Sequence, residues 1–116
     1  MPRSGRAGVS RITDSQDIRS LKRTGRFFRG RFVLIWFSHK DSDEAEEPVV
    51  GVVAGKGFGR AVDRNLAKRR VRGCILGMKR LLEPGNRYLV ECRPGAETAD
   101  YQYLVIEIER ALSRSK

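Results

Sequence analysis

Apolar residues run without interruption from position 32 to position 37, and this run helps to place the other elements. Successive side chains of a strand point to opposite faces of a sheet. The two faces that result carry Phe32, Leu34 and Trp36 on one side, and Val33, Ile35 and Phe37 on the other. Because both faces are apolar, the pattern predicts a strand in the centre of a sheet.

Strand signals also occur on both sides of this run. Residues 26–38 are rich in aromatic and β-branched side chains, and Gly30 is expected to divide them into two strands or to bend one. Residues 49–54 and 87–93 are two further predicted strands. Residues 40–48 hold five of the fourteen acidic residues of the chain and are predicted to form a solvated hairpin loop.

Apolar residues at three- and four-residue steps predict a helix near each end of the chain. Residues 14–17 supply a cap and first-turn carboxylates for a short helix that ends at Gly25, with Ile18 and Leu21 facing inward. Thr98 is the predicted cap of a closing helix. The inward positions of that closing helix are Tyr101, Leu104, Val105, Ile108, Ala111 and Leu112.

A third, longer helix is predicted in the middle of the chain. Proline is absent from residues 60–83, so one helix of more than twenty residues is allowed, with Gly57 and Gly59 at its start. Gly73 and Gly77 weaken its middle. On a helical projection, one wall is apolar and carries Ala67, Val71, Cys74, Met78 and Leu81. Another wall is cationic and carries Arg64, Asn65, Lys68, Arg69 and Arg72.

Together these elements predict an α+β fold. It is an α/β sandwich in which three helices pack on a four-stranded mixed sheet, in the order α-β-β-β-α-β-α. A chain of 116 residues is large enough for one core, so we expect a single domain over residues 11–116. Residues 1–10 contain Pro, Gly and Arg without apolar periodicity and are predicted to form a flexible basic arm.

The distribution of charge indicates an anionic partner. The formal net charge is +10, with +7 over residues 1–31, −4 over 32–53, +8 over 54–80 and −1 over 81–116. Residues 54–80 hold nine Lys or Arg against Asp63 alone, so carboxylates along the helix cannot neutralise them. Six of the nine are Arg, whose planar guanidinium group can bind two phosphate oxygens at once. The pattern favours a nucleic acid.

The same composition argues against several other classes of protein. Cys74, Cys92 and His39 are too few for a zinc site, and both cysteines are expected to be buried thiols of a reduced compartment. No apolar run is long enough to span a bilayer, so we expect a cytoplasmic protein with no membrane partner. Motifs for a nucleophile or a phosphate-binding loop are missing, and catalysis by the side chains of this chain is not expected.

Residues 59–72 have the sequence GRAVDRNLAKRRVR, and this segment resembles the signature helix of the protein subunit of bacterial ribonuclease P. That signature, Gly-x-Ala-x-x-Arg-Asn-x-x-Lys-Arg-x-x-Arg, is met at every specified position. The similarity extends over roughly residues 11–112. Residues 50–56 are similar to the strand before the helix, residues 88–94 to the strand closed by Arg-Pro, and residues 11–25 to the first helix.

The resemblance implies a division of labour with RNA. In that family the RNA subunit performs catalysis with Mg²⁺ ions that it carries itself, and it hydrolyses the phosphodiester at the 5′ end of precursor tRNA. The protein binds this RNA and the single-stranded 5′ leader, with no further protein partner required and no metal on the protein alone. The residues implied to contact the catalytic RNA are Lys56, Arg60, Arg64, Asn65, Lys68, Arg69 and Arg72. Those implied to line the leader cleft are Ile18, Lys22, Val33, Ile35 and Arg93.

Three of the cleft positions depart from the family pattern. Aromatic residues are usual where this chain has Ile18, Lys22 and Ile35. Leader contacts are therefore expected to rely on Lys22 and on apolar packing, or on one of the aromatic residues Phe27, Phe28 or Trp36. The family is also described with a left-handed βαβ crossover, against the right-handed rule, and the resemblance implies that hand here.

Other functions share some of these features. A ribosomal or RNA-chaperone protein would use the same cationic wall without a processing role. A helix-turn-helix DNA binder is disfavoured, because no second short helix adjoins the basic one. The segment KGFG at residues 56–59 matches the start of the RNP1 signature of RRM domains, but the residues after it are cationic and helical where RNP1 continues as a strand.

Overall fold

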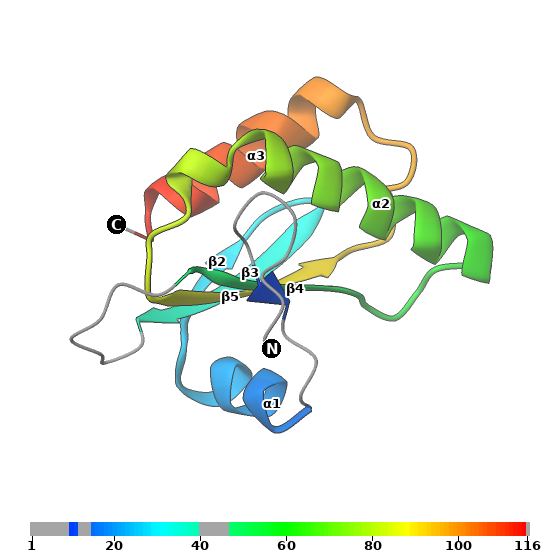
Figure 1. Ribbon diagram of the computed structural model, residues 1–116. Helices are drawn as coiled ribbons and strands as arrows, with labels where there is room; N and C mark the ends of the chain where they lie inside the picture. The colour runs from blue at the N-terminus through cyan, green and yellow to red at the C-terminus, as the bar shows by residue number, and fades with distance from the viewer. Residues whose placement is uncertain (1–9, 12–14, 40–46, 116) are drawn as a thin grey trace.

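The computed structural model describes residues 10–11, 15–39 and 47–115. These residues form one mixed sheet, with α1 on one face and with α2 and α3 on the other (Figure 1). The strands are β1 (Ser10–Arg11), β2 (Arg26–Arg29), β3 (Val33–His39), β4 (Val49–Ala54) and β5 (Asn86–Cys92). The helices are α1 (Ser15–Thr24), α2 (Ala61–Gly77) and α3 (Tyr101–Ser113), and a short 3₁₀ helix, η1 (Lys79–Leu81), follows α2.

The predicted α+β fold is confirmed, with its three helices and four strands in the predicted order. The structure adds the two-residue strand β1, which pairs in parallel with β4 through Ser10 and Val49. Residue 10 belongs to the predicted basic arm, because two residues are too few for an alternating pattern to show. Residues 1–9 of that predicted arm lie outside the described residues.

The strands are arranged in the order β1-β4-β5-β3-β2. Strand β3 pairs antiparallel with both β2 and β5, whereas β4 pairs in parallel with β5, so the sheet is mixed as predicted. Strand β5 lies between β3 and β4, so the prediction of a hairpin joining these two strands was wrong. Helix α2 connects the parallel strands β4 and β5 and makes them a crossover unit. The left hand expected for this crossover stays a prediction.

The two apolar faces of β3 pack against different helices. Val33, Ile35 and Phe37 are at most 4% exposed and belong to the main core, which also contains residues of α2 and α3. Their neighbours Leu34 and Trp36 point to the other face, where α1 packs. The prediction of a central strand with two covered faces is confirmed.

Helix α2 is shorter than the sequence allowed. It ends at Gly77, after which Met78 leaves the helical conformation with φ of −123° and ψ of 26°. This break is followed by η1, and Met78 and Leu82 on either side of it are 6% and 5% exposed. The low helix propensity of Gly77 lets the chain turn there, so that two apolar side chains can reach the core.

Helix α3 begins later than predicted. Its cap is Asp100 and not the predicted Thr98. The Oδ1 atom of Asp100 accepts a hydrogen bond from the backbone N–H of Gln102 at 2.8 Å. Thr98 lies in the preceding turn, where its backbone N–H donates to the Gly95 carbonyl. Asp and Thr are both good caps, and the turn after β5 decides which of them stands directly before the first helical residue.

A carboxylate of α3 holds the turn between β2 and β3. Glu107 Oε1 accepts a hydrogen bond from the Arg31 N–H at 2.9 Å, and Oε2 accepts from the N–H groups of Phe32 and Val33 at 2.8 and 2.9 Å. A Cβ atom at Gly30 would overlap this carboxylate. Gly30 therefore separates the two strands as predicted, and its lack of a side chain leaves room for the Glu107 carboxylate.

Both cysteines are free and buried, as the sequence predicts. Burial raises the pKa of the Cys92 thiol to about 12, although the nearby cations Arg72 and Lys68 act in the opposite direction. Because the thiolate is the reactive form, we expect neither Cys92 nor Cys74 to react with an aromatic disulfide reagent at pH 8 while the protein is folded. Both should react within minutes in denaturant. Rapid labelling of the folded protein would contradict the buried assignment.

Candidate nucleic-acid interface

The outer wall of α2 presents a continuous set of polar side chains. Arg64, Asn65 and Arg69 are exposed, and Lys68 and Arg72 are half-buried. We call these five residues the α2 cationic face. None of their side chains forms a hydrogen bond or an ion pair within the part of the chain that the structure describes. Four positive charges are thus held on one rigid helix without an internal partner, which is the arrangement expected for binding an external anion.

The packing of α2 explains how this face is oriented. Ala67, Val71, Cys74 and Ile75 are at most 3% exposed, and they fix the opposite side of the helix against the sheet and α3. The helical period then turns the cationic positions away from the core. The prediction that α2 has an apolar wall and a cationic wall is confirmed.

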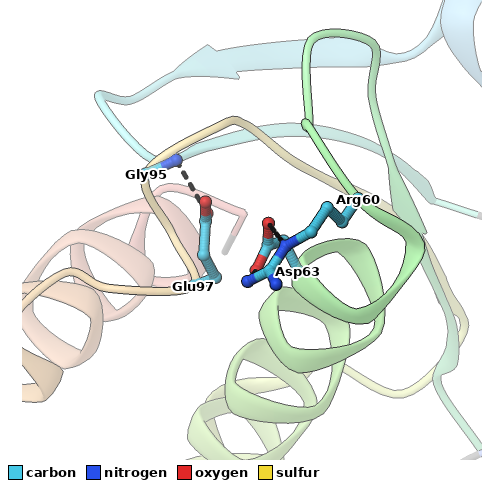
Figure 2. Close-up of polar contacts among 4 residues, drawn as sticks. All are labelled: Arg60, Asp63, Gly95 and Glu97. Carbon is cyan, nitrogen blue, oxygen red and sulfur yellow. Dashed lines mark hydrogen bonds and ion pairs between the residues drawn. The ribbon is translucent and has the colours of Figure 1, made fainter.

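Carboxylates do occur at the beginning of α2. The guanidinium group of Arg60 forms an ion pair with Asp63, with Nη2 3.2 Å from Oδ1, and Glu97 accepts a hydrogen bond from the Gly95 N–H at 2.8 Å (Figure 2). The bond to Asp63 raises the pKa of Arg60, which is charged in any case. Arg60 is therefore partly neutralised, whereas Lys56 is exposed and free of such a partner among the described residues.

Arg70 has a structural task instead. Its Nη1 and Nη2 donate to the carbonyls of Ala96 and Ala99 at 2.6 and 2.5 Å, and its guanidinium lies over the Tyr101 ring. It joins α2 to the turn before α3. The positive charge that the sequence shows along residues 54–80 is therefore not all available to a ligand.

A second candidate surface lies on the other face of the sheet, beside α1. The Nζ of Lys22 is 2.9 Å from Glu91 Oε1 and lies 5.0 Å from the centre of the Trp36 ring. The Phe27 ring is 5.1 Å from that of Trp36 and is 50% exposed. We call Lys22, Phe27 and Trp36 the aromatic platform. A cation beside an aromatic pair can contact both the phosphate and the base of an unpaired nucleotide.

The predicted cleft residues are only partly brought together. Ile18 and Lys22 share one side of α1, one turn apart, and Ile18 is half-buried. Val33 and Ile35 are 0% exposed beneath α2 and α3, so assigning them to a ligand-binding cleft was wrong. Arg93 is partly occupied by an internal contact, because its Nη1 donates to the Gly30 carbonyl at 2.9 Å.

Phe27 and Trp36 take the accessible positions on this face. The sequence predicts them, together with Phe28, only as possible substitutes for the aromatic residues usual at the cleft positions. Phe28 points to the opposite face, where Arg114 covers its ring. The signal that could have separated them is the pairing of β2 with β3, in which Phe27 stands opposite Trp36, and Phe28 stands opposite Ile35.

Comparison with known proteins decides the family. A family model described as "Ribonuclease P" matches residues 7–116. The chain belongs to the ribonuclease P protein family. As a ribonuclease P protein, it is the protein component of the ribonucleoprotein that matures tRNA 5′ ends, and its partner is the RNA subunit of that enzyme.

Individual ribonuclease P proteins agree with this assignment. The ribonuclease P protein component of Acidothermus cellulolyticus is 32% identical over 104 residues, which are 90% of this chain and 86% of that protein. That of Mycobacterium avium is 39% identical over 72 residues, 62% of this chain and 60% of the relative.

The solved structures of ribonuclease P proteins share the fold. The Staphylococcus aureus RNase P protein has a TM-score of 0.75 at 21% identity, covering 91% of this chain and 94% of its own. The Thermotoga maritima protein has a TM-score of 0.75 at 22% identity, covering 90% of this chain and 96% of its own.

The helices of the described residues are too short or too polar to span a lipid bilayer.

Proposed function

We propose that the α2 cationic face binds the catalytic RNA of ribonuclease P. The observation that carries this proposal is the absence, among the described residues, of any carboxylate paired with Arg64, Lys68, Arg69 or Arg72. Four cations on one helix repel each other, and contact with RNA phosphates removes that repulsion. Lys56 and Arg60 flank the face and add to it, with Arg60 weakened by its pair with Asp63.

In this proposal, the RNA subunit cleaves the phosphodiester bond. We also propose that the Mg²⁺ ions used in this reaction are carried by the RNA subunit. The protein contributes positive charge, which screens the repulsion between a large RNA and its precursor tRNA substrate. We place this reaction in the cytoplasm, where precursor tRNA is made in bacteria.

The aromatic platform is the part of the protein that we propose to contact the 5′ leader of precursor tRNA. The leader is single-stranded, so its bases are free to stack on Phe27, which is the exposed member of the Phe27–Trp36 pair. Lys22 lies above Trp36 and offers a positive charge to the leader phosphates, although its ion pair with Glu91 neutralises part of that charge. Ile18, one turn away on α1, adds apolar contact.

Replacing Phe27 by alanine tests the platform. Stacking of a base on an aromatic ring is worth about 1 to 3 kcal/mol, so Phe27→Ala should weaken holoenzyme binding of precursor tRNA roughly tenfold. Binding of mature tRNA, which has no leader, should be unchanged. Equilibrium binding of both tRNAs to the reconstituted holoenzyme measures the difference.

The matched control is Ile106→Ala. Ile106 is 44% exposed on the outer side of α3, so its removal takes away an exposed apolar side chain without touching the platform. The control should bind both tRNAs as the unsubstituted protein does. Equal losses for precursor and mature tRNA in Phe27→Ala would show that the leader lies elsewhere.

A further inference from the structure

A second group of arginines lies along the free edge of the sheet at β2, which is the outermost strand on the side opposite β1. Strand β2, the turn after it and α3 all contribute to the group. Its members, all exposed, are Arg26, Arg29, Arg31, Arg110 and Arg114, and we call them the arginine edge. It is separate from the α2 cationic face, because none of its residues comes from α2.

Two contacts hold α3 alongside β2 and so bring these residues together. Glu107 binds the turn after β2, and the guanidinium of Arg114 lies 5.2 Å from the centre of the Phe28 ring. Arg110 is three residues after Glu107 and four before Arg114, so it lies on the same side of the helix. All five arginines therefore belong to one border of the molecule.

Three of the five guanidinium groups lie over phenylalanine rings at cation–π distance. Arg26 lies over Phe37 at 5.2 Å, Arg31 over Phe32 at 5.5 Å, and Arg114 over Phe28 at 5.2 Å. A cation–π contact attracts the guanidinium group to the ring and restricts its movement, while its N–H groups stay available. These arginines are oriented in advance, unlike freely rotating surface cations.

No carboxylate among the described residues neutralises the arginine edge. None of its five members forms an ion pair there, and both oxygens of Glu107, the acid on this side of α3, already accept hydrogen bonds from the backbone. A simpler role for such charge is to prevent another strand from pairing with β2. That role requires charge on β2, but it requires neither guanidinium groups held over aromatic rings nor Arg110 in α3 and Arg114 at its C-terminal cap.

We propose that the arginine edge binds the distal part of the 5′ leader, the nucleotides beyond those on the aromatic platform. This inference rests on the proposed function, because it continues the path of the leader. Phe27 is exposed on the α1 face of β2, and its neighbours Arg26 and Phe28 point to the α3 face, so a strand leaving Phe27 meets the arginines as it crosses the edge. Guanidinium groups can bind phosphates through N–H and stack on unpaired bases.

The test compares two leader lengths. Precursor tRNAs with leaders of about 4 and about 16 nucleotides span the range of site sizes of single-strand binding modules. The double variant Arg31→Ala, Arg110→Ala should bind the long-leader substrate about tenfold more weakly as a holoenzyme. Its affinity for the short-leader substrate should stay within about twofold of the unsubstituted value, because phosphate contacts are lost only where the leader reaches them. Thermal unfolding of both proteins checks that the fold is intact.

The control variant Lys79→Ala, Arg80→Ala removes the same charge from exposed positions in η1 and should leave the difference between the two leaders unchanged. The proposal is overturned if the arginine-edge variant still binds the long-leader substrate as much more tightly than the short-leader substrate as the unsubstituted protein does. It is also overturned if the variant loses affinity equally for both substrates. Self-association of the variant without a change in leader dependence would mean that the arginines only protect the edge. Failure of the proposed function looks different, because Phe27→Ala would then leave the preference for precursor tRNA intact.

Discussion

Replacing both Arg64 and Arg69 by alanine is expected to weaken binding of the catalytic RNA about 100-fold. Each side chain is exposed and has no partner within the described part of the chain, so each is free to bind phosphate. A hydrogen bond to a charged group contributes about 1.5 kcal/mol, or roughly tenfold in affinity. The slope of log K against log salt should also fall in magnitude by about 0.7 to 0.9 per lost contact.

The fold should tolerate this change, because alanine is the best helix former and neither arginine packs against the core. Titration of the RNA with protein at several salt concentrations gives both the affinity and the slope. The variant Lys79→Ala, Arg80→Ala again serves as the control for total charge. An unchanged slope, or an equal loss in the control, would remove the α2 cationic face from the interface.

Removal of the Glu107 carboxylate should destabilise the protein more than any surface change discussed above. In Glu107→Ala, the N–H groups of Phe32 and Val33 lose a charged acceptor in a partly buried place, while the exposed N–H of Arg31 can turn to water. We expect the free energy of unfolding to fall by about 3 kcal/mol. The melting temperature should fall by roughly 10 °C for a domain of this size.

Two further variants identify the cause. Glu109→Ala removes an exposed carboxylate from the same helix and should change stability by about 0.5 kcal/mol or less. Glu107→Gln keeps one acceptor oxygen and should fall between the alanine variant and the unsubstituted protein. If Glu107→Ala unfolds at the same temperature as Glu109→Ala, the carboxylate does not hold the turn between β2 and β3.

The sequence predicted those parts of the fold that follow from local periodicity. The walls of α2 and the alternation along β3 are set by backbone geometry, and both appear in the structure as predicted. The end of α2 at Gly77 was missed, because a glycine inside a helical pattern lowers propensity without requiring a stop. Strand β1 was missed because its two residues show no pattern.

The candidate site was harder to predict, because it depends on contacts between distant parts of the chain. Both faces of β3 are apolar, so the alternation could not say whether Val33 and Ile35 or Leu34 and Trp36 lie under α2 and α3. Nor does a sequence show that Arg70 binds carbonyls 26 and 29 residues away. Charge counts identify a cationic helix, but only the packed structure shows which of its cations remain unpaired.

The bond between Glu107 and the turn after β2 also bears on how the protein is made. The groups it joins are 74 to 76 residues apart, so a ribosome must have released nearly the whole domain before the turn is secured. Contacts this distant along the chain form late and slow folding. A nascent chain that has not yet produced α3 exposes the apolar side of β3 and β5, and its core cannot be completed until α3 has left the ribosome.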